Sequence, residues 1–126
     1  MNPADLFARE ENPVRLAAGE TLFKAGDPGD CMFVLIEGAL SVNVGNQVVE
    51  HSERGAIVGE MALFDHSPRA ATVTASQPST LVKLDERRFR YLISQNPFFA
   101  MHVMKLLADR IRQMNQLLTE QKNSAA

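Results

Sequence analysis

Between residues 14 and 85 the chain alternates short apolar runs with turn-forming residues, and this spacing constrains the fold more than any other feature. The runs are rich in Val, Leu, Ile, Phe and Thr and lie at 21–23, 32–36, 40–44, 48–50, 71–75 and 80–84. Gly, Pro, Asn and Asp separate them, and the Gly45-Asn46 pair is typical of a two-residue hairpin turn. Short strands at such close spacing predict an antiparallel sandwich or barrel.

The two ends of the chain have helical patterns instead. Asn2 can cap a short helix that has Pro3 at its first position. Asp85 can cap a second short helix, and the pattern over 97–121 predicts a longer third one. The polar residues 122–126 are expected to form a frayed tail. Together these patterns predict an α+β fold, an antiparallel jelly-roll-like β-roll with a short N-terminal helix and two C-terminal helices.

Composition predicts one globular domain over residues 1–126, because 45% of the residues are hydrophobic and 22% are charged. We expect the N-terminal helix within 1–13, the β-roll within 14–85 and the C-terminal helices within 86–121. The net charge of −2 argues against a nucleic-acid partner. The single cysteine, Cys31, excludes an internal disulfide and is expected to be buried and inert.

The chain contains no apolar run long enough to span a membrane, and its first residues are not typical of a signal peptide. We therefore expect a cytoplasmic protein with no membrane partner.

One segment, residues 59–73, carries the chemistry of an anion site and reads GEMALFDHSPRAATV. It places the carboxylate of Glu60 nine residues before the guanidinium of Arg69. A carboxylate can accept hydrogen bonds from a sugar hydroxyl, and an arginine can hold a phosphate with two parallel donors. Small residues between the two leave backbone N–H groups open to an anion. The pattern therefore indicates a ligand with both a ribose hydroxyl and a phosphate.

This segment closely resembles the phosphate-binding cassette of the cyclic nucleotide-binding domains. The resemblance extends over about residues 14–120 and includes the glycine-containing stretches at 19–23, 26–30 and 32–38. Gly55 stands four residues before Gly59, as in the family, although Ala56 occupies a position where an acidic residue is common.

The resemblance implies a role for each cassette residue. Glu60 would receive the ribose 2′-hydroxyl, and Arg69 would bind the exocyclic phosphate oxygens. Ala70 and Ala71 would offer a backbone N–H and a small surface. The predicted ligand-binding residues are Gly59, Glu60, Met61, Ala62, Arg69, Ala70 and Ala71 in the cassette, with Met114 and Asn115 in the last helix.

The resemblance also implies which base is bound. Threonine at the position of Ala70 favours cyclic GMP in eukaryotic members, so alanine favours cyclic AMP, with cyclic GMP as the alternative. When Asn96-Pro97 is matched to the same pair in the catabolite activator protein, Met114 and Asn115 fall where base-contacting hydroxyl residues lie. Met114 would cover the base and Asn115 would hydrogen-bond to it, although neither has a hydroxyl.

The function that these inferences favour is that of a cyclic nucleotide sensor that signals through movement of its C-terminal helix. We expect no catalysis and no cofactor besides the nucleotide. An a/d pattern in the last helix predicts a homodimer, unless the same stripe only packs on the barrel; it consists of Met104, Leu107, Ile111, Met114 and Leu118. No effector segment follows this helix, so we expect an effector protein or domain in trans, or a chain cut from a longer protein.

Two other classes of protein stay open. One is a module of the same fold that binds no ligand and serves dimerisation or protein interaction. The other is a cupin-type metalloenzyme, which needs a His-x-His motif and a glutamate that converge on one ion. His51, His66 and His102 lack that spacing, so a metal site is disfavoured.

Overall fold

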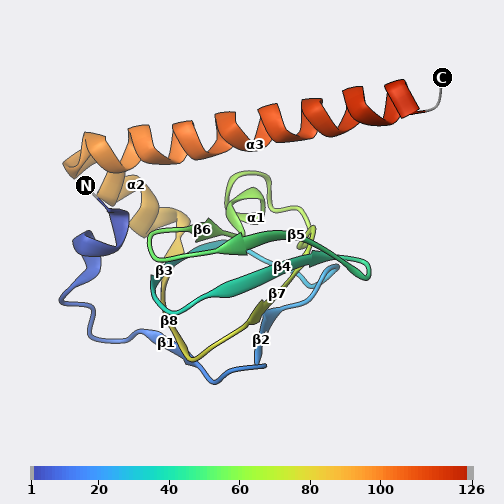
Figure 1. Cartoon of the computed structure of the whole chain (residues 1–126). Helices are drawn as coiled ribbons and strands as arrows, with labels where there is room; N and C mark the ends of the chain where they lie inside the picture. The colour runs from blue at the N-terminus through green and yellow to red at the C-terminus, as the bar shows by residue number, and fades with distance from the viewer. Residues whose placement is uncertain (1, 125–126) are drawn as a thin grey trace. The chain divides into compact units, whose positions relative to one another are not determined.

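The computed structural model describes residues 2–124 (Figure 1). The chain forms two compact units, Met1–Tyr91 and Leu92–Ala126. The first unit contains η1 (Pro3–Phe7), a 3₁₀ helix, all the strands, α1 (Glu60–Asp65) and the first part of α2 (Glu86–Gln95). The second contains the end of α2 and α3 (Pro97–Ser124).

The strands of the first unit form two four-stranded sheets in which every pair of neighbours is antiparallel. One sheet has the order β1-β8-β3-β6, with bounds Val14–Leu16, Ser79–Asp85, Cys31–Glu37 and Ile57–Val58. The other has the order β2-β7-β4-β5, with bounds Thr21–Phe23, Thr72–Ala75, Leu40–Val44 and Gln47–Ser52. This arrangement confirms the predicted α+β fold with an antiparallel β-roll.

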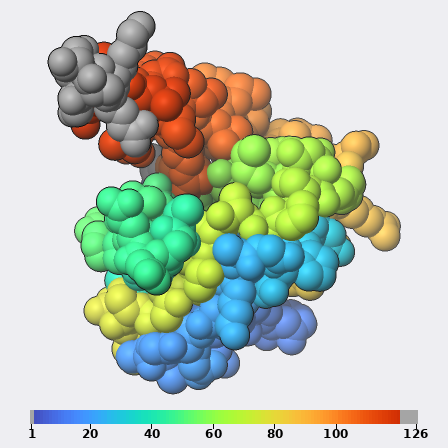
Figure 2. Space-filling model, turned by 90° about the vertical axis from the view of Figure 1, so that its right-hand side faces the viewer, coloured from blue at the N-terminus to red at the C-terminus, as the bar shows by residue number. Residues whose placement is uncertain are grey.

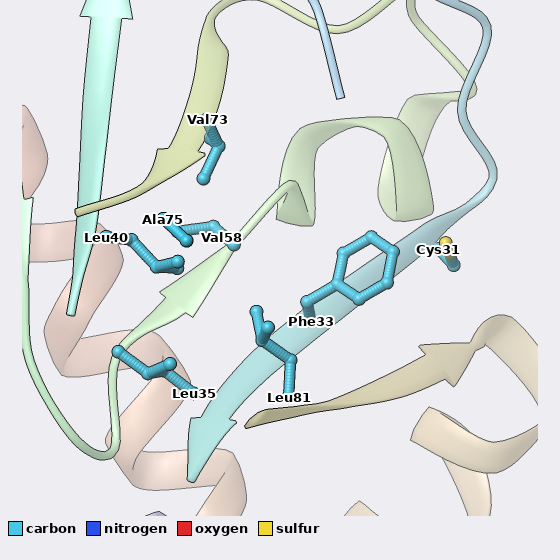
Figure 3. Close-up of a cluster of buried hydrophobic side chains, with 8 residues drawn as sticks. All are labelled: Cys31, Phe33, Leu35, Leu40, Val58, Val73, Ala75 and Leu81. Carbon is cyan, nitrogen blue, oxygen red and sulfur yellow. The ribbon is translucent and has the colours of Figure 1, made fainter. Parts of the chain in front are cut away.

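The core lies between the two sheets. Alternate residues of β3 point to the same face of their sheet, so Phe33 and Leu35 reach the space between the layers (Figure 3). Leu40 and Val73 close this core from the opposite sheet. Cys31 is the first residue of β3 and lies at one end of the cluster. The packing of this core therefore fixes the N-terminal end of β3, which is the end nearest to the cassette.

Strand bounds agree with the predicted runs, with a few differences. The Gly45-Asn46 hairpin is confirmed, because Val44 pairs with Gln47 and Gly45 has a φ of 62°. β7 begins at Thr72, one residue later than expected. The strands β1 and β6 had not been predicted, and they are only three and two residues long.

The helix caps follow the sequence. The Asn2 side chain accepts a hydrogen bond from the N–H of Ala4 at 2.9 Å, although the segment it caps is 3₁₀ rather than α-helical. Asp85 caps α2 by accepting from the N–H of Arg88 at 2.8 Å. Asn96 accepts from the N–H of Phe99 at 3.2 Å, at the start of α3.

Helix α3 continues to Ser124, so the expectation of a frayed tail from residue 122 is wrong for its first three residues, and 125–126 lie outside the described part of the chain. Within that described part, no helix combines the length and apolar character that crossing a bilayer requires.

An ion pair between Glu10 and Arg88 joins the segment after η1 to α2. The hydrogen bond from Arg88 is the main reason why the pKa of the Glu10 carboxyl lies below its usual value of 4.5. The Arg88 guanidinium also lies over the Phe7 ring, 5.8 Å from its centroid. These two contacts hold the N-terminal helix η1 and the segment after it against α2, within the first unit.

Candidate functional site

Helix α1 carries the first half of the cassette. Gly59 is its N-cap and has a φ of 79°, a left-handed conformation that glycine adopts without strain. Glu60 is the first helical residue and its side chain is 6% exposed, whereas Met61 is 51% exposed. Ala62 is buried, so the helix can lie close to β3. Glu60 is therefore a buried carboxylate at the start of this helix.

Arg69 carries the second half, and its backbone is fixed by the turn that precedes β3. Its N–H donates to the carbonyl of Asp27 at 2.8 Å, and its own carbonyl accepts from the N–H of Gly26 at 2.8 Å. The N–H of Ala25 donates to the Thr72 hydroxyl at 3.0 Å. In Figure 2 the yellow-green end of the cassette lies against the blue segment that contains this turn.

The Arg69 side chain turns inward and is only 7% exposed. Its Nη1 donates to the carbonyl oxygens of Cys31 and Gly59, at 2.8 and 3.0 Å. Its Nη2 donates to the Cys31 sulfur at 3.4 Å. The guanidinium carbon lies 4.3 Å from the centroid of the Phe23 ring and 5.8 Å from that of Phe33. These contacts hold a permanent positive charge at the end of β3.

One nitrogen of this guanidinium, the buried Nε, has no hydrogen-bond partner among the described residues. Leaving such a donor unpaired costs free energy, particularly on a charged group. An anion beside Nε would satisfy it, and a phosphate oxygen is an acceptor that suits a guanidinium. The residues present therefore fit the phosphate that the sequence pattern indicates.

Two glycines provide the space in which the guanidinium lies. A β-carbon added to Gly29 would lie 2.4 Å from Nε of Arg69, and one added to Gly59 would lie 2.4 Å from Nη1. Both distances are far below van der Waals contact, so any side chain at these positions would displace the guanidinium. The glycines of the two motifs thus form one cradle around Arg69.

The remaining predicted residues fall into two groups. Ala70 is exposed and Ala71 is partly buried, and both directly follow Arg69 in the cassette. Met114 is 60% exposed and Asn115 is also exposed, on α3. Because α3 belongs to the second unit, the structure does not relate them to the cassette, and their contacts with the base stay predictions.

Three residues of the site were not named as ligand-site residues from the sequence, namely Phe23, Gly29 and Cys31. The glycine of the 26–30 stretch was a usable signal, because it belongs to the family resemblance. Cys31 was expected to be buried and inert. It is buried, at 4% exposure, but it also accepts hydrogen bonds from Arg69 and is therefore more than a packing residue.

A separate open hollow of about 600 Å³ lies near the C-terminal end of α1. It is lined by charged or titratable residues, Asp30, His66, Asp85, Glu86, Arg87 and Arg90. Glu86 and Arg90 pair with each other at 2.7 Å. Because this lining mixes both signs of charge, it suits a phosphate less well than the Arg69 cradle does.

The three histidines lie on different elements, on β5, after α1 and on α3. Among residues 2–124 no three His, Cys, Asp or Glu side chains gather in a group that could hold a metal ion.

Comparison with known proteins assigns the family. The model of the cyclic nucleotide-binding domain matches residues 13–96 of this chain, which include the whole β-roll and the cassette. The chain belongs to the cyclic nucleotide-binding domain family. The feature that members of this family share is the cyclic nucleotide-binding domain, and the fold described above contains that domain.

Individual relatives agree with this assignment. The cyclic nucleotide-gated potassium channel mll3241 of Mesorhizobium japonicum is 39% identical over 93 residues, which are 74% of this chain and 26% of the channel. The chain therefore spans about a quarter of that relative's length. The solved structure of the Thermus thermophilus catabolite activator protein has a TM-score of 0.74 at 26% identity, over 85% of this chain and 53% of that one.

A second similar structure is one reported as "A cyclic-GMP-dependent signalling pathway regulates bacterial phytopathogenesis". It has a TM-score of 0.71 at 28% identity, and the match covers 85% of this chain and 89% of that chain.

Proposed function

We propose that this chain is a sensor module that binds a cyclic nucleotide, with cyclic AMP favoured, in the cassette around Arg69. The observation that carries the proposal is the buried Nε of Arg69, which has no partner among the described residues and lies in the cradle of Gly29 and Gly59. A phosphate would accept from this donor. Glu60, at the start of α1, would accept a hydrogen bond from the ribose 2′-hydroxyl.

The base preference rests on Ala70. This residue is exposed, follows Arg69 directly and has no hydroxyl to offer a guanine amino group. Cyclic AMP is therefore favoured over cyclic GMP, although one similar structure comes from work on a cyclic-GMP-dependent pathway. Met114 and Asn115 of α3 would complete the base contact, as an apolar cover and a hydrogen-bond partner.

Signalling would pass from α1 to the C-terminal helices. Leu63 is buried, and the ring of Phe64 meets that of Phe89 on α2 edge to face, with centroids 5.4 Å apart. A ligand that orders α1 would change this contact and favour one arrangement of the helices. It can shift that equilibrium only by its difference in affinity for the two arrangements.

The partners follow from the same scheme. A homodimer through α3 and an effector in trans, or elsewhere on a longer chain, would receive the signal. We place the protein in the cytoplasm, where cyclic nucleotides are made and read, and propose no catalytic role for the domain itself.

Calorimetric titration with the cyclic nucleotides of adenosine, guanosine, cytidine and uridine tests the proposal. We expect saturable binding that is tightest for cyclic AMP. Arg69→Ala should weaken it at least about 100-fold, whereas Arg90→Ala should not, because Arg90 pairs with Glu86 on the surface. Absence of binding for all four nucleotides by a folded protein would favour the alternative, a ligand-free dimerisation or interaction module.

A further inference from the structure

Cys31 contacts the Arg69 guanidinium with two of its own atoms. Its carbonyl oxygen accepts from Nη1 at 2.8 Å, and its sulfur accepts from Nη2 at 3.4 Å. The two residues are 38 positions apart in the chain, and both are buried, at 4% and 7% exposure. Water competes little for these donors at that depth, so even a weak acceptor such as a thiol can orient them.

A count of the guanidinium donors shows what these contacts leave available. An arginine has five N–H donors, two on each Nη and one on Nε. Nη1 donates to Cys31 and to Gly59, and Nη2 donates to the Cys31 sulfur. Because Cys31 binds both terminal nitrogens, it occupies the end of the planar group. The donors that remain are the N–H of Nε and the second N–H of Nη2.

Because Cys31 contacts both terminal nitrogens, we assign to its sulfur the Nη2 N–H that faces Nη1. The two remaining donors then lie on the same edge of the guanidinium and point in the same direction. An edge of this kind can bind two oxygens of one phosphate through parallel hydrogen bonds. Nε is the buried donor that has no partner among the described residues. The contacts to Cys31 and Gly59 thus select which edge of Arg69 is presented.

We propose that Cys31 is a positioning residue for phosphate recognition. Its thiol and carbonyl hold the end of the Arg69 guanidinium, so that the edge formed by Nε and Nη2 faces the ligand. The inference rests on the proposed function, because it assumes that Arg69 binds the phosphate of a cyclic nucleotide. A cysteine at such a position is expected only to pack. The inference gives this cysteine a part in setting the affinity for the cyclic nucleotide.

Substitutions of Cys31 separate this role from packing. Cys31→Ser keeps a side-chain acceptor at the same position, whereas Cys31→Ala removes the acceptor and leaves the carbonyl in place. Both side chains are small and fit the start of β3. Thermal unfolding of both variants, recorded without ligand, shows whether each is folded.

Calorimetric titration with cyclic AMP provides the first measurement. We expect Cys31→Ala to bind about three- to tenfold more weakly than the wild type, and Cys31→Ser to stay within about twofold. Equal affinity of the wild type and Cys31→Ala would overturn the inference and leave the proposed function intact. A folded wild type that binds no cyclic nucleotide would overturn both.

A second measurement responds to orientation and not to packing. The two diastereomers of the cyclic AMP phosphorothioate place sulfur at one or the other exocyclic position. A fixed Arg69 edge should distinguish them, and Cys31→Ala should bring their affinities closer together by at least about twofold. If Cys31→Ala weakens both diastereomers by the same factor, Cys31 only packs and the inference is wrong.

Discussion

The cassette and helix α3 differ in which kind of side chain they bury and which kind they expose. The cassette buries charged side chains, with Arg69 at 7% and Glu60 at 6% exposure. Helix α3 leaves large apolar side chains more than half exposed, at 56–75%; they are Phe98, Met101, Met104, Ile111, Met114, Leu117 and Leu118. Each arrangement is unfavourable by itself, because charged side chains favour water and large apolar side chains favour the protein interior.

This difference in burial indicates what kind of partner stabilises each region. Arg69 is compensated within its own unit by the carbonyl oxygens of Cys31 and Gly59, and the buried Nε, which has no partner among the described residues, fits a small anion. The apolar stripe of α3 has no comparable explanation within a single helix, and we propose a second copy of the chain as its partner.

The largest effect should follow from removing the buried charge. Arg69→Ala removes two charge-assisted hydrogen bonds to phosphate, so binding of cyclic AMP should fall at least about 100-fold. Arg69→Lys should recover little, because an ammonium cannot present a planar edge. Titration calorimetry measures both, and Arg90→Ala is the matched surface control. Wild-type affinity in a folded Arg69→Ala variant contradicts the assignment of the cassette.

A charge placed in the apolar stripe should affect assembly and leave folding unchanged. Ile111→Asp should give a folded monomer, because the β-roll core lies in the other unit. The stripe extends over about two heptads, so the wild-type dimer should dissociate at roughly micromolar concentrations.

Sedimentation equilibrium with and without cyclic AMP measures this dimer. Gln116→Asp is the control, since it puts the same charge on the opposite face of α3. A wild type that stays monomeric at high concentration with ligand would leave the stripe without a self-association role.

A smaller change is expected at the exposed position beside Arg69. Ala70→Thr adds a hydroxyl near the base and should reduce the preference for cyclic AMP over cyclic GMP by about 1 kcal/mol. Ala71→Thr makes the same chemical change one residue further on and should leave the preference unchanged. Competition titrations with the two nucleotides measure the ratio. A wild type that prefers cyclic GMP shows that Ala70 does not decide the base.

The smallest effect concerns a charge pair outside both regions. The pKa of Glu10 is lowered by Arg88, so the pair stabilises the fold above pH 4.5 and this contribution is lost as the pH falls through the lowered pKa. Glu10→Gln should reduce the free energy of unfolding at pH 7 by about 0.5–1 kcal/mol, a small value because Arg88 is 45% exposed.

Urea unfolding at pH 7 and at about pH 3 measures this contribution, and the difference between wild type and variant should shrink at the lower pH. Glu86→Gln, in a more exposed pair, should show a smaller difference at pH 7.

Most of the fold could be predicted because its main strands carry their own signals. β3 and β8 each contain seven residues, and the hairpin between β4 and β5 is marked by Gly45-Asn46. β6 was missed because two residues show no periodicity, and β1 was missed because, unlike the equally short β2, it has a charged residue, Arg15, at its centre. β6 exists through its pairing with β3, where Val58 lies opposite Phe33, and only the folded chain brings these residues together.

The site shows the same division between local and long-range information. The cassette could be predicted because its residues are continuous in sequence and resemble a known family. Three neighbours of Arg69, namely Phe23, Gly29 and Cys31, come from the region 23–31, and no local pattern connects them to residue 69. The roles of Met114 and Asn115 stay predictions, because they depend on the placement of α3.

The backbone pairing of Arg69 has a kinetic consequence. Its N–H donates to the carbonyl of Asp27 and its carbonyl accepts from the N–H of Gly26, so backbone hydrogen bonds join this end of the cassette to the turn that precedes β3. The Arg69 amide should exchange slowly with deuterium in the free protein, and ligand should slow exchange mainly in α1. The Arg69 end of the site would then stay in place while α1 becomes ordered around the ligand. The conformational entropy lost on binding would come from α1 alone.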